Sequence, residues 1–297
     1  MTSIMHSQGA PVWVATRDGR RLYGQVLPGP ADSPTVVFEA GSGATRSYWA
    51  AVQLRVAAGA RAIVYDRAGL GRSEPDPAGR SLDRMADDLV DLLDHFGPGP
   101  FILVGHSAGG AIVRLAASKR LHLLAGLVLV EPVDESADVL FGKAFRRNER
   151  IGIAVGKVLA RLGVLRFLYG SLLAAAPAAD VREDLRREAF THRVLETQRR
   201  QAGSFLDDLA AWRSCPPEVG DLPVTVISGA LALAKDGMPQ QVRAQAIAAH
   251  VHRAAQSAGG RHVIAQHSGH AVPVTEPQLV ADEIARLVAK ARGQSGG

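Results

Sequence analysis

The chain has 297 residues, 47% of them hydrophobic, and a formal net charge of +5. This length fits two average domains or one large α/β domain, and the apolar content is ample for a buried core. No apolar stretch is long enough to predict a spanning helix, and residues 1–10 lack the pattern of a signal peptide. A single cysteine, Cys215, excludes an internal disulfide and any site built on a cysteine pair. We therefore expect a soluble, cytoplasmic protein.

The basic character of the chain raises the question of an acidic partner. Basic and acidic residues are mostly interleaved and no nucleic-acid motif appears, so we expect no nucleic-acid partner. One segment, residues 143–166, holds seven basic residues and one acid, Glu149, among apolar residues. It fits either weak contact with an anionic lipid surface or acidic substrate, or a solvated helix face that covers a pocket. We favour the second interpretation.

Short apolar runs alternate with helical patterns along the chain. Strands are predicted at residues 12–16, 21–27, 35–40, 61–66, 101–105, 126–130, 223–228 and 262–265. Asp18-Gly19 predicts a hairpin between the first two strands. Helices are predicted at residues 47–58, at 82–96, and after residue 275. Apolar runs without polar alternation, separated by helices, indicate a mostly parallel sheet covered on both faces, with the hairpin as its antiparallel edge.

Residues 132–221 interrupt this alternation, because they contain helical patterns and no convincing strand. They lie between two strands of the predicted sheet. We therefore predict that 132–221 form an inserted helical lid, and that 1–131 and 222–297 form the α/β core. No internal repeat is present.

The segment Gly105-His106-Ser107-Ala108-Gly109 directly follows an apolar strand and precedes a helical stretch. A serine on such a strand-to-helix turn adopts a strained backbone that exposes its hydroxyl above the sheet. Glycine at 105 and 109 leaves room for the turn. We predict Ser107 as a nucleophile.

The order of strands, elbow serine, inserted helices and late histidine resembles the α/β-hydrolase superfamily over essentially the whole chain. Residues 39–43 stand where many members have His-Gly-x-Gly, although Ala40 replaces the histidine. Residues 65–73 resemble the loop after the family's fourth strand, and 268–270 its catalytic-histidine loop. The resemblance implies an α/β-hydrolase fold with a helical lid and the activity of a serine hydrolase.

A serine nucleophile needs an imidazole base, and the base needs an anionic partner. His270 lies in a loop after the last predicted strand, in the expected chain order of serine, acid and histidine. The weaker candidates for the base are His106, His250, His252, His262 and His267.

The acid has candidates at two positions. Glu131 directly follows the strand after the elbow, with Asp134 just beyond, and some haloalkane dehalogenases of the superfamily carry their acid there. Asp236 follows the next strand at a distance of seven residues from Gly229. We rank Glu131 first, then Asp236 and Asp134, because an acid close to a strand end is held better than one far out on a loop.

The backbone N–H groups of Ser42 and Ala108 are the expected oxyanion donors. Asp66, Arg67 and Arg72 either line the entrance or, as we favour, serve a structural role. Together these residues predict a serine hydrolase acting on a carboxylic ester or related acyl compound with an apolar acyl part, without metal or cofactor. Carbon–carbon bond hydrolases, thioesterases and acyltransferases use the same apparatus, and a non-catalytic small-molecule receptor is the alternative outside enzymes.

Overall fold

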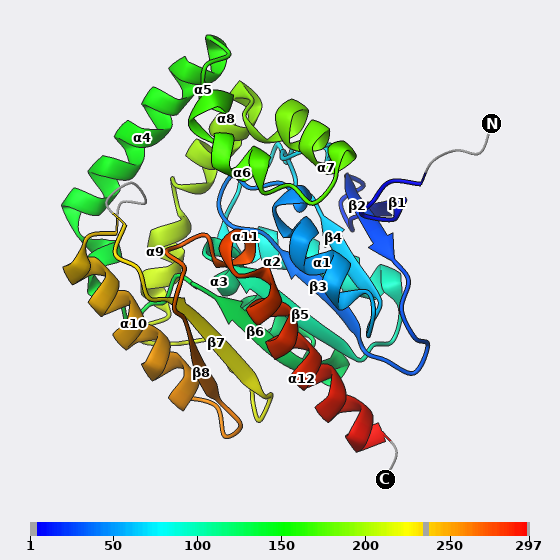
Figure 1. The fold of residues 1–297 in the computed structure, drawn as a ribbon. Helices are drawn as coiled ribbons and strands as arrows, with labels where there is room; N and C mark the ends of the chain where they lie inside the picture. Colours follow the sequence, from blue (N-terminus) through cyan, green and yellow to red (C-terminus); the bar gives the residue numbers. More distant parts are fainter. Residues whose placement is uncertain (1–4, 234–237, 296–297) are drawn as a thin grey trace.

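The computed structural model describes residues 5–233 and 238–295. Within these ranges an eight-stranded sheet crosses the molecule in the order β1-β2-β4-β3-β5-β6-β7-β8 (Figure 1). Its strands are β1 (Ala10–Ala15), β2 (Arg21–Leu27), β3 (Thr35–Glu39), β4 (Ala62–Tyr65), β5 (Phe101–His106), β6 (Leu124–Val130), β7 (Val224–Gly229) and β8 (Arg261–Ala265).

The sheet has the predicted topology. β1 and β2 form an antiparallel hairpin, and β2 is antiparallel to β4. All other pairs, from β4 through β8, are parallel. The prediction of a mostly parallel sheet with an antiparallel edge is therefore confirmed, and the fold is that of an α/β hydrolase.

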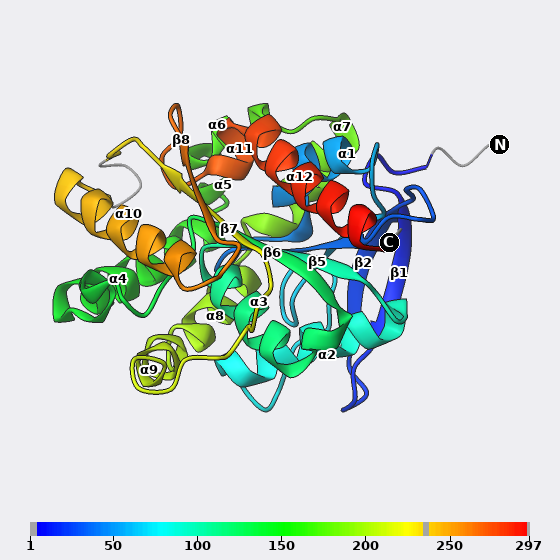
Figure 2. The same cartoon turned by 90° about the horizontal axis from the view of Figure 1, so that it is seen from below.

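Helices cover both faces of the sheet (Figure 2). One face carries α1 (Ala50–Val56) and α12 (Pro277–Ser295), and the other carries α2 (Leu82–Phe96), α3 (Ala108–Lys119) and α10 (Gln240–Ala255). Successive side chains of a strand point to opposite faces. Accordingly Phe101 and Leu103 of β5 belong to the α2–α3 apolar cluster, whereas Ile102 and Val104 belong to the α1–α12 cluster. This double burial explains why the central strands lack polar alternation.

Shorter elements complete the core. These are η1 (Arg46–Trp49), η2 (Leu121–Leu123) and α11 (Val272–Thr275). No helix in the described ranges is long and apolar enough to cross a membrane.

Between β6 and β7 the chain forms helices and, within the described residues, no strand. They are η3 (Asp138–Phe141), α4 (Lys143–Arg161), α5 (Leu165–Leu168), α6 (Gly170–Ala174), α7 (Ala179–Asp184), η4 (Leu185–Ala189), α8 (His192–Gln201) and α9 (Phe205–Ala211). We call residues 132–221 the inserted segment. Its α8 lies over the carboxyl end of the sheet, since a Cβ on Gly43 would be 3.0 Å from Gln198 Oε1.

The inserted segment does not pack as one body. Phe205, Leu206, Leu209 and Trp212, in and just after α9, belong to the large α2–α3 cluster of the core. In contrast, α5 and α8 contribute to a small separate cluster around Leu165 and Leu195. The division into a core and a lid at residues 132–221 stays a prediction, and α9 packs as part of the core.

Candidate active site

Ser107 lies on the tight turn between β5 and α3. Its φ of 53° and ψ of −121° are rare for a residue with a side chain. The flanking glycines permit this turn, because a Cβ on Gly105 would lie 2.5 Å from the Gly109 carbonyl oxygen. A Cβ on Gly109 would lie equally close to the carbonyl oxygen of Glu39. The Ser107 amide donates to Val130 O at 3.1 Å, which ties the elbow to the end of β6.

Glu131 follows β6 directly and contacts His270. Its backbone is also strained, with φ at 47°. The carboxylate is buried, and its Oε2 lies 3.1 Å from His270 Nδ1. Oε1 accepts a hydrogen bond from the Gly229 amide at 2.7 Å. Because an ionised carboxylate can only accept, Nδ1 of His270 carries the proton and leaves the Nε2 lone pair free as a base.

A buried arginine also holds the Glu131 carboxylate. Arg243, on α10, places its Nη1 2.6 Å from Oε1 and 2.7 Å from Oε2. Burial alone would raise the pKa of Glu131, but the hydrogen bond and electrostatic interaction with His270, with help from Arg243, lower that pKa to about 2. The carboxylate is therefore ionised at neutral pH.

His106 packs beneath His270. The two imidazole rings lie 4.8 Å apart, and His106 Nε2 donates to the His270 carbonyl oxygen at 2.9 Å. Burial lowers the pKa of His106 to about 3, so this ring is neutral. No hydrogen bond joins Ser107 Oγ to His270 in the part of the chain that the structure describes.

The other candidate acids are not in contact with His270 or lie outside the described residues. Asp134 binds Arg253 at 2.7 Å and the Ser136 hydroxyl at 2.6 Å. Its burial is outweighed by these partners, which lower its pKa to about 2. Asp236 lies outside the described residues. Of the acids described, Glu131 is the one whose carboxylate hydrogen-bonds to His270.

The other candidate histidines have different partners. His250 Nδ1 and His262 Nε2 lie 2.7 and 2.8 Å from the Ser228 hydroxyl, which they share. His267 offers its backbone amide to Glu276, and His252 is exposed near Gln256. None of them contacts Glu131 through a hydrogen bond within the described residues.

The loop after β3 touches the elbow. A Cβ on Gly41 would lie 3.3 Å from Ser107 Cβ. The carbonyl oxygen of Gly41 accepts a hydrogen bond from Arg67 Nη2 at 2.7 Å, and Arg67 Nη1 donates to Ala40 O. In a planar trans peptide the C=O and the next N–H point in opposite directions. The Ser42 N–H therefore points away from Arg67.

Both expected oxyanion donors are available. The Ala108 N–H opens α3, where the first amides have no partner inside the helix. Neither it nor the Ser42 N–H donates a hydrogen bond elsewhere among the described residues. Both belong to segments that adjoin Ser107.

Two buried arginines support the site, and the sequence indicates only the first of them, Arg67, for which we favour a structural role. Arg67 is buried and holds the Ala40 and Gly41 carbonyls and the Glu39 carboxylate, so it supports the loop rather than lining an entrance. The sequence does not predict any role for Arg243, which holds the Glu131 carboxylate. Glu39, the buried acid at the end of β3, is the ionic partner of Arg67, and burial raises the pKa of its carboxyl.

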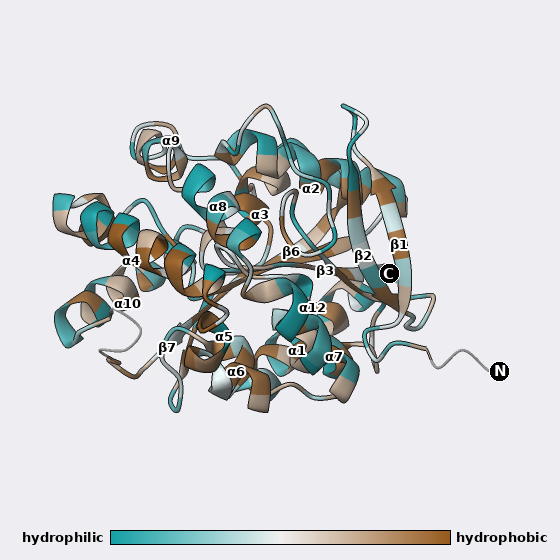
Figure 3. Cartoon of the chain, turned by 90° about the horizontal axis from the view of Figure 1, so that it is seen from above, coloured by the Kyte–Doolittle hydropathy of each residue, from teal (hydrophilic) through white to brown (hydrophobic). Residues whose placement is uncertain are grey.

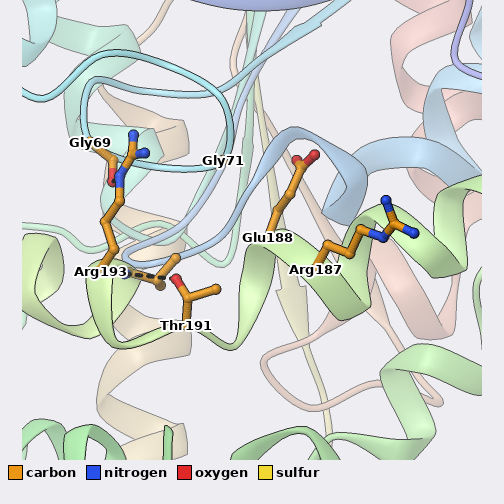
Figure 4. A pocket seen from close by; sticks show the side chains of 7 residues that line it. Gly69, Gly71, Arg187, Glu188, Thr191 and Arg193 are labelled. Carbon is orange, nitrogen blue, oxygen red and sulfur yellow. Dashed lines mark hydrogen bonds between the residues drawn. The ribbon is translucent and has the colours of Figure 1, made fainter. Parts of the chain in front are cut away.

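A cavity of about 210 Å³ lies at the junction of the core and the inserted segment (Figure 4). Gly69 and Gly71 of the core border it on one side, and Glu188, Thr191 and Arg193 of the inserted segment border it on the other. Neither Ser107, Glu131 nor His270 lines it. This cavity is therefore separate from the candidate active site. Within the described residues, no group of His, Cys, Asp and Glu is suited to hold a metal ion.

Solved structures share the fold over nearly the whole chain. A structure from Pseudomonas aeruginosa described as a "putative epoxide hydrolase" superposes with a TM-score of 0.73 and 18% identity, covering 98% of this chain and 99% of that one. A thermophilic esterase from Thermogutta terrifontis has a TM-score of 0.65 and 21% identity, covering 96% and 100%. At these identities the likeness concerns the fold alone.

Curated relatives match shorter segments. A protein of Rhizobium rhizogenes named "Putative carbamate hydrolase RutD" is 29% identical over 184 residues, which are 62% of this chain and 67% of that protein. "Uncharacterized protein YqjL" of Bacillus subtilis is 34% identical over 118 residues, and the match spans 46% of its length. Residues 36–283 match the profile of the alpha/beta hydrolase family. The chain therefore belongs to the alpha/beta hydrolase family.

Proposed function

We propose that this chain is a serine hydrolase that cleaves a carboxylic ester or a related acyl compound through an acyl-enzyme. The observation that carries the proposal is the hydrogen bond of 3.1 Å between the ionised Glu131 carboxylate and His270 Nδ1, beside the strained Ser107 elbow. An acid, an imidazole and a hydroxyl in this order form the apparatus that activates a serine.

The reaction begins with proton transfer from the Ser107 hydroxyl to His270 Nε2. The serine oxygen attacks the substrate carbonyl carbon, and the N–H groups of Ser42 and Ala108 stabilise the resulting oxyanion. His270 then gives its proton to the leaving alcohol. Water, deprotonated by His270, attacks the acyl-enzyme and releases the carboxylic acid with free Ser107.

Glu131 keeps His270 in the tautomer that this sequence of steps requires. It also stabilises the imidazolium that forms when His270 takes the proton. The low pKa of Glu131 supports this role, because the carboxylate stays charged throughout.

The chemistry of residue 107 separates this proposal from epoxide hydrolysis. An epoxide hydrolase of this fold would form an alkyl ester on a carboxylate nucleophile, and the elbow residue here is a serine. Carbamates, which the name of one relative mentions, are acyl compounds that the same serine would attack. The proposal therefore covers esters, thioesters and carbamates as substrates to be compared.

The proposal is tested by labelling the purified chain with a fluorophosphonate probe, with Ser107→Ala as its matched control. We expect covalent labelling of the parent and none of the variant, followed by turnover of at least one member of a panel of acyl esters, thioesters and carbamates. A folded parent that neither reacts nor turns over any acyl compound, and binds a small molecule instead, would establish the receptor alternative.

A further inference from the structure

The outer face of α4 carries large apolar side chains that are left exposed. Ile151, Val155, Val158 and Leu162 are 54, 52, 54 and 69% exposed. Their spacing of four, three and four residues places them on one stripe along the helix. Phe167 and Leu168 of α5 continue the stripe and are 70 and 65% exposed. Figures 1 and 3 show α4 at the outer edge of the molecule. We call these six residues the α4–α5 surface.

The contacts of α4 with the rest of the protein do not involve this stripe. Ile153 and Gly156 are buried on the opposite side of the helix, and a Cβ on Gly156 would lie 3.0 Å from Leu195 of α8. A helix that only covered α8 would present polar residues to solvent. The exposed face of α4 thus carries large apolar side chains beside its charged ones, and a contiguous exposed apolar surface indicates a contact with a partner.

Positive charge flanks the α4–α5 surface. Arg147, Arg150, Arg161 and Arg166 are exposed and form no ion pair with the described residues. In contrast, the other basic residues that face the protein, Arg146 and Lys157, pair with Asp207 and Glu196. The four arginines outnumber the one acid of this helix, Glu149, which interacts electrostatically with Arg150, so a net positive charge remains beside the stripe.

We propose that the α4–α5 surface docks on an anionic lipid bilayer surface, with α4 lying in the plane of the interface. An interfacial helix inserts its apolar face to the level of the acyl chains, while flanking arginines contact lipid phosphates. A second copy of this chain fits the surface less well. Two copies face to face would bring eight arginines without ion pairs together, counting four from each, and their positive charges would repel.

The α4–α5 surface is connected to the candidate active site through α8. α4 packs on α8, and α8 in turn lies over Gly43, next to the predicted oxyanion donor Ser42. Docking would therefore occur through the segment that covers the carboxyl end of the sheet. The binding itself does not depend on the hydrolytic chemistry proposed above.

The test is co-sedimentation of the full chain with vesicles of phosphatidylcholine, with and without phosphatidylglycerol. We expect binding to the vesicles that contain phosphatidylglycerol, weakened by salt, and much weaker binding to phosphatidylcholine alone. Leu162→Ser with Phe167→Ser should weaken binding at least about tenfold, because two large apolar side chains no longer insert. Arg161→Gln with Arg166→Gln should weaken it about tenfold as well.

The matched control combines Leu54→Ser and Arg55→Gln on α1, which change an exposed leucine and arginine elsewhere and should leave binding unchanged. Light scattering of the same proteins distinguishes a second copy. A parent that dimerises and ignores both vesicle types, with dimers lost in the Leu162 and Phe167 variant, overturns the proposal. Equal losses in the control variant, or no vesicle binding by the folded parent, overturn it too. Vesicle binding is measured without any activity assay, so the docking proposal can fail while the proposed hydrolysis holds, and the reverse.

Discussion

Glu131 accepts hydrogen bonds from a histidine, an arginine and a backbone amide at once. Glu131→Gln would place an amide group against His270 Nδ1, which favours the wrong histidine tautomer. We expect kcat to fall about 10³- to 10⁴-fold while the fold is retained. Asp134→Asn is the matched control, because Asp134 is a buried, arginine-bound acid that does not contact His270. An equal loss of kcat in Asp236→Asn instead would assign the acid to that residue.

The same carboxylate gives a pH dependence of stability with a defined sign. The pKa of Glu131 is lowered from 4.5 to about 2, so its charge stabilises the folded state above the unfolded pKa. This contribution, about 3 kcal/mol by the shift, is lost as the pH falls from about 5 to about 2. Urea unfolding should therefore give a larger free energy of unfolding for the parent than for Glu131→Gln at about pH 7. The difference between the two should narrow at about pH 3. A difference in unfolding free energy that stays constant with pH would contradict this role of the Glu131 charge.

Arg67 is the residue that orients the predicted oxyanion donor. Lysine in its place keeps the charge but lacks the planar fork that holds Ala40 and Gly41 carbonyls together. Because the Ser42 N–H meets charge that develops only in the transition state, Arg67→Lys should lower kcat by about tenfold to a hundredfold with little change in KM. Binding of a trifluoromethyl ketone should weaken in parallel.

The matched control for this prediction is Arg80→Lys. Arg80 is a buried arginine that also donates to a backbone carbonyl, but that of Ala68, outside the predicted oxyanion loop. Arg80→Lys should lower the stability of the protein but should not lower kcat selectively. A rise in KM alone for Arg67→Lys would show that Arg67 does not act on the oxyanion donors.

At the scale of elements, the sheet is predictable because each strand is specified locally. Buried strands on both faces need continuous apolar runs, and the helix predicted at residues 82–96 coincides with α2. The elbow follows from glycines whose missing Cβ atoms leave space for the turn. The contacts of Arg67 and Arg243 are not predictable in this way, since Arg243 meets Glu131 across 112 residues of sequence.

The position of the inserted segment on the core is likewise not predictable from local sequence patterns. Helical spacing indicates its helices, but their positions depend on long-range ion pairs. Arg46 of the core is fully buried and pairs with Asp66 and with two acids of the inserted segment, Asp184 and Glu188. The two acids lie 138 and 142 residues further along the chain. The periodicity of hydrophobic residues in the sequence does not indicate which distant acid an arginine will pair with.

The ion pairs of Arg46 predict how the inserted segment is fastened. Arg46→Met would leave three carboxylates together without their buried cation, so we expect a loss of about 3–5 kcal/mol of stability. Limited proteolysis should then cut first within α7 and η4. Arg72→Met is the control, because Arg72 contacts the same two acids from a half-exposed position and should cost about 1 kcal/mol or less. Equal losses of stability in Arg46→Met and Arg72→Met would show that the burial of Arg46 does not determine its contribution.

At the scale of the whole molecule, the candidate site collects residues that follow β3, β5, β6 and β8 at one edge of the sheet. The carboxyl ends of parallel strands meet at this edge, so four distant chain segments converge there without long loops. The two apolar clusters on the faces of the sheet hold these strand ends in register. The site is thus built on the most deeply buried part of the protein.

The inserted segment differs from this foundation in how it is stabilised. α5 and α8 share one small apolar cluster, around Leu165 and Leu195, and α8 otherwise makes hydrogen bonds to the core, from Arg193 and Thr197 to the Gly69 carbonyl oxygen. α9 instead buries Leu209 in the large α2–α3 cluster. Segments with few buried apolar contacts open at lower free energy than the core.

Native-state hydrogen exchange should therefore divide the inserted segment. Amides of α4, α5 and α8 are expected to exchange by local opening, at a free energy several kcal/mol below that of α3 and β5. Amides of α9 should be protected like those of α2, because both helices share one cluster. Exchange is to be followed in increasing urea, where local openings respond weakly to denaturant and global unfolding strongly. If α8 instead follows α3 at every urea concentration, the protein opens as one cooperative unit, and substrate must then reach Ser107 without movement of the helices above it.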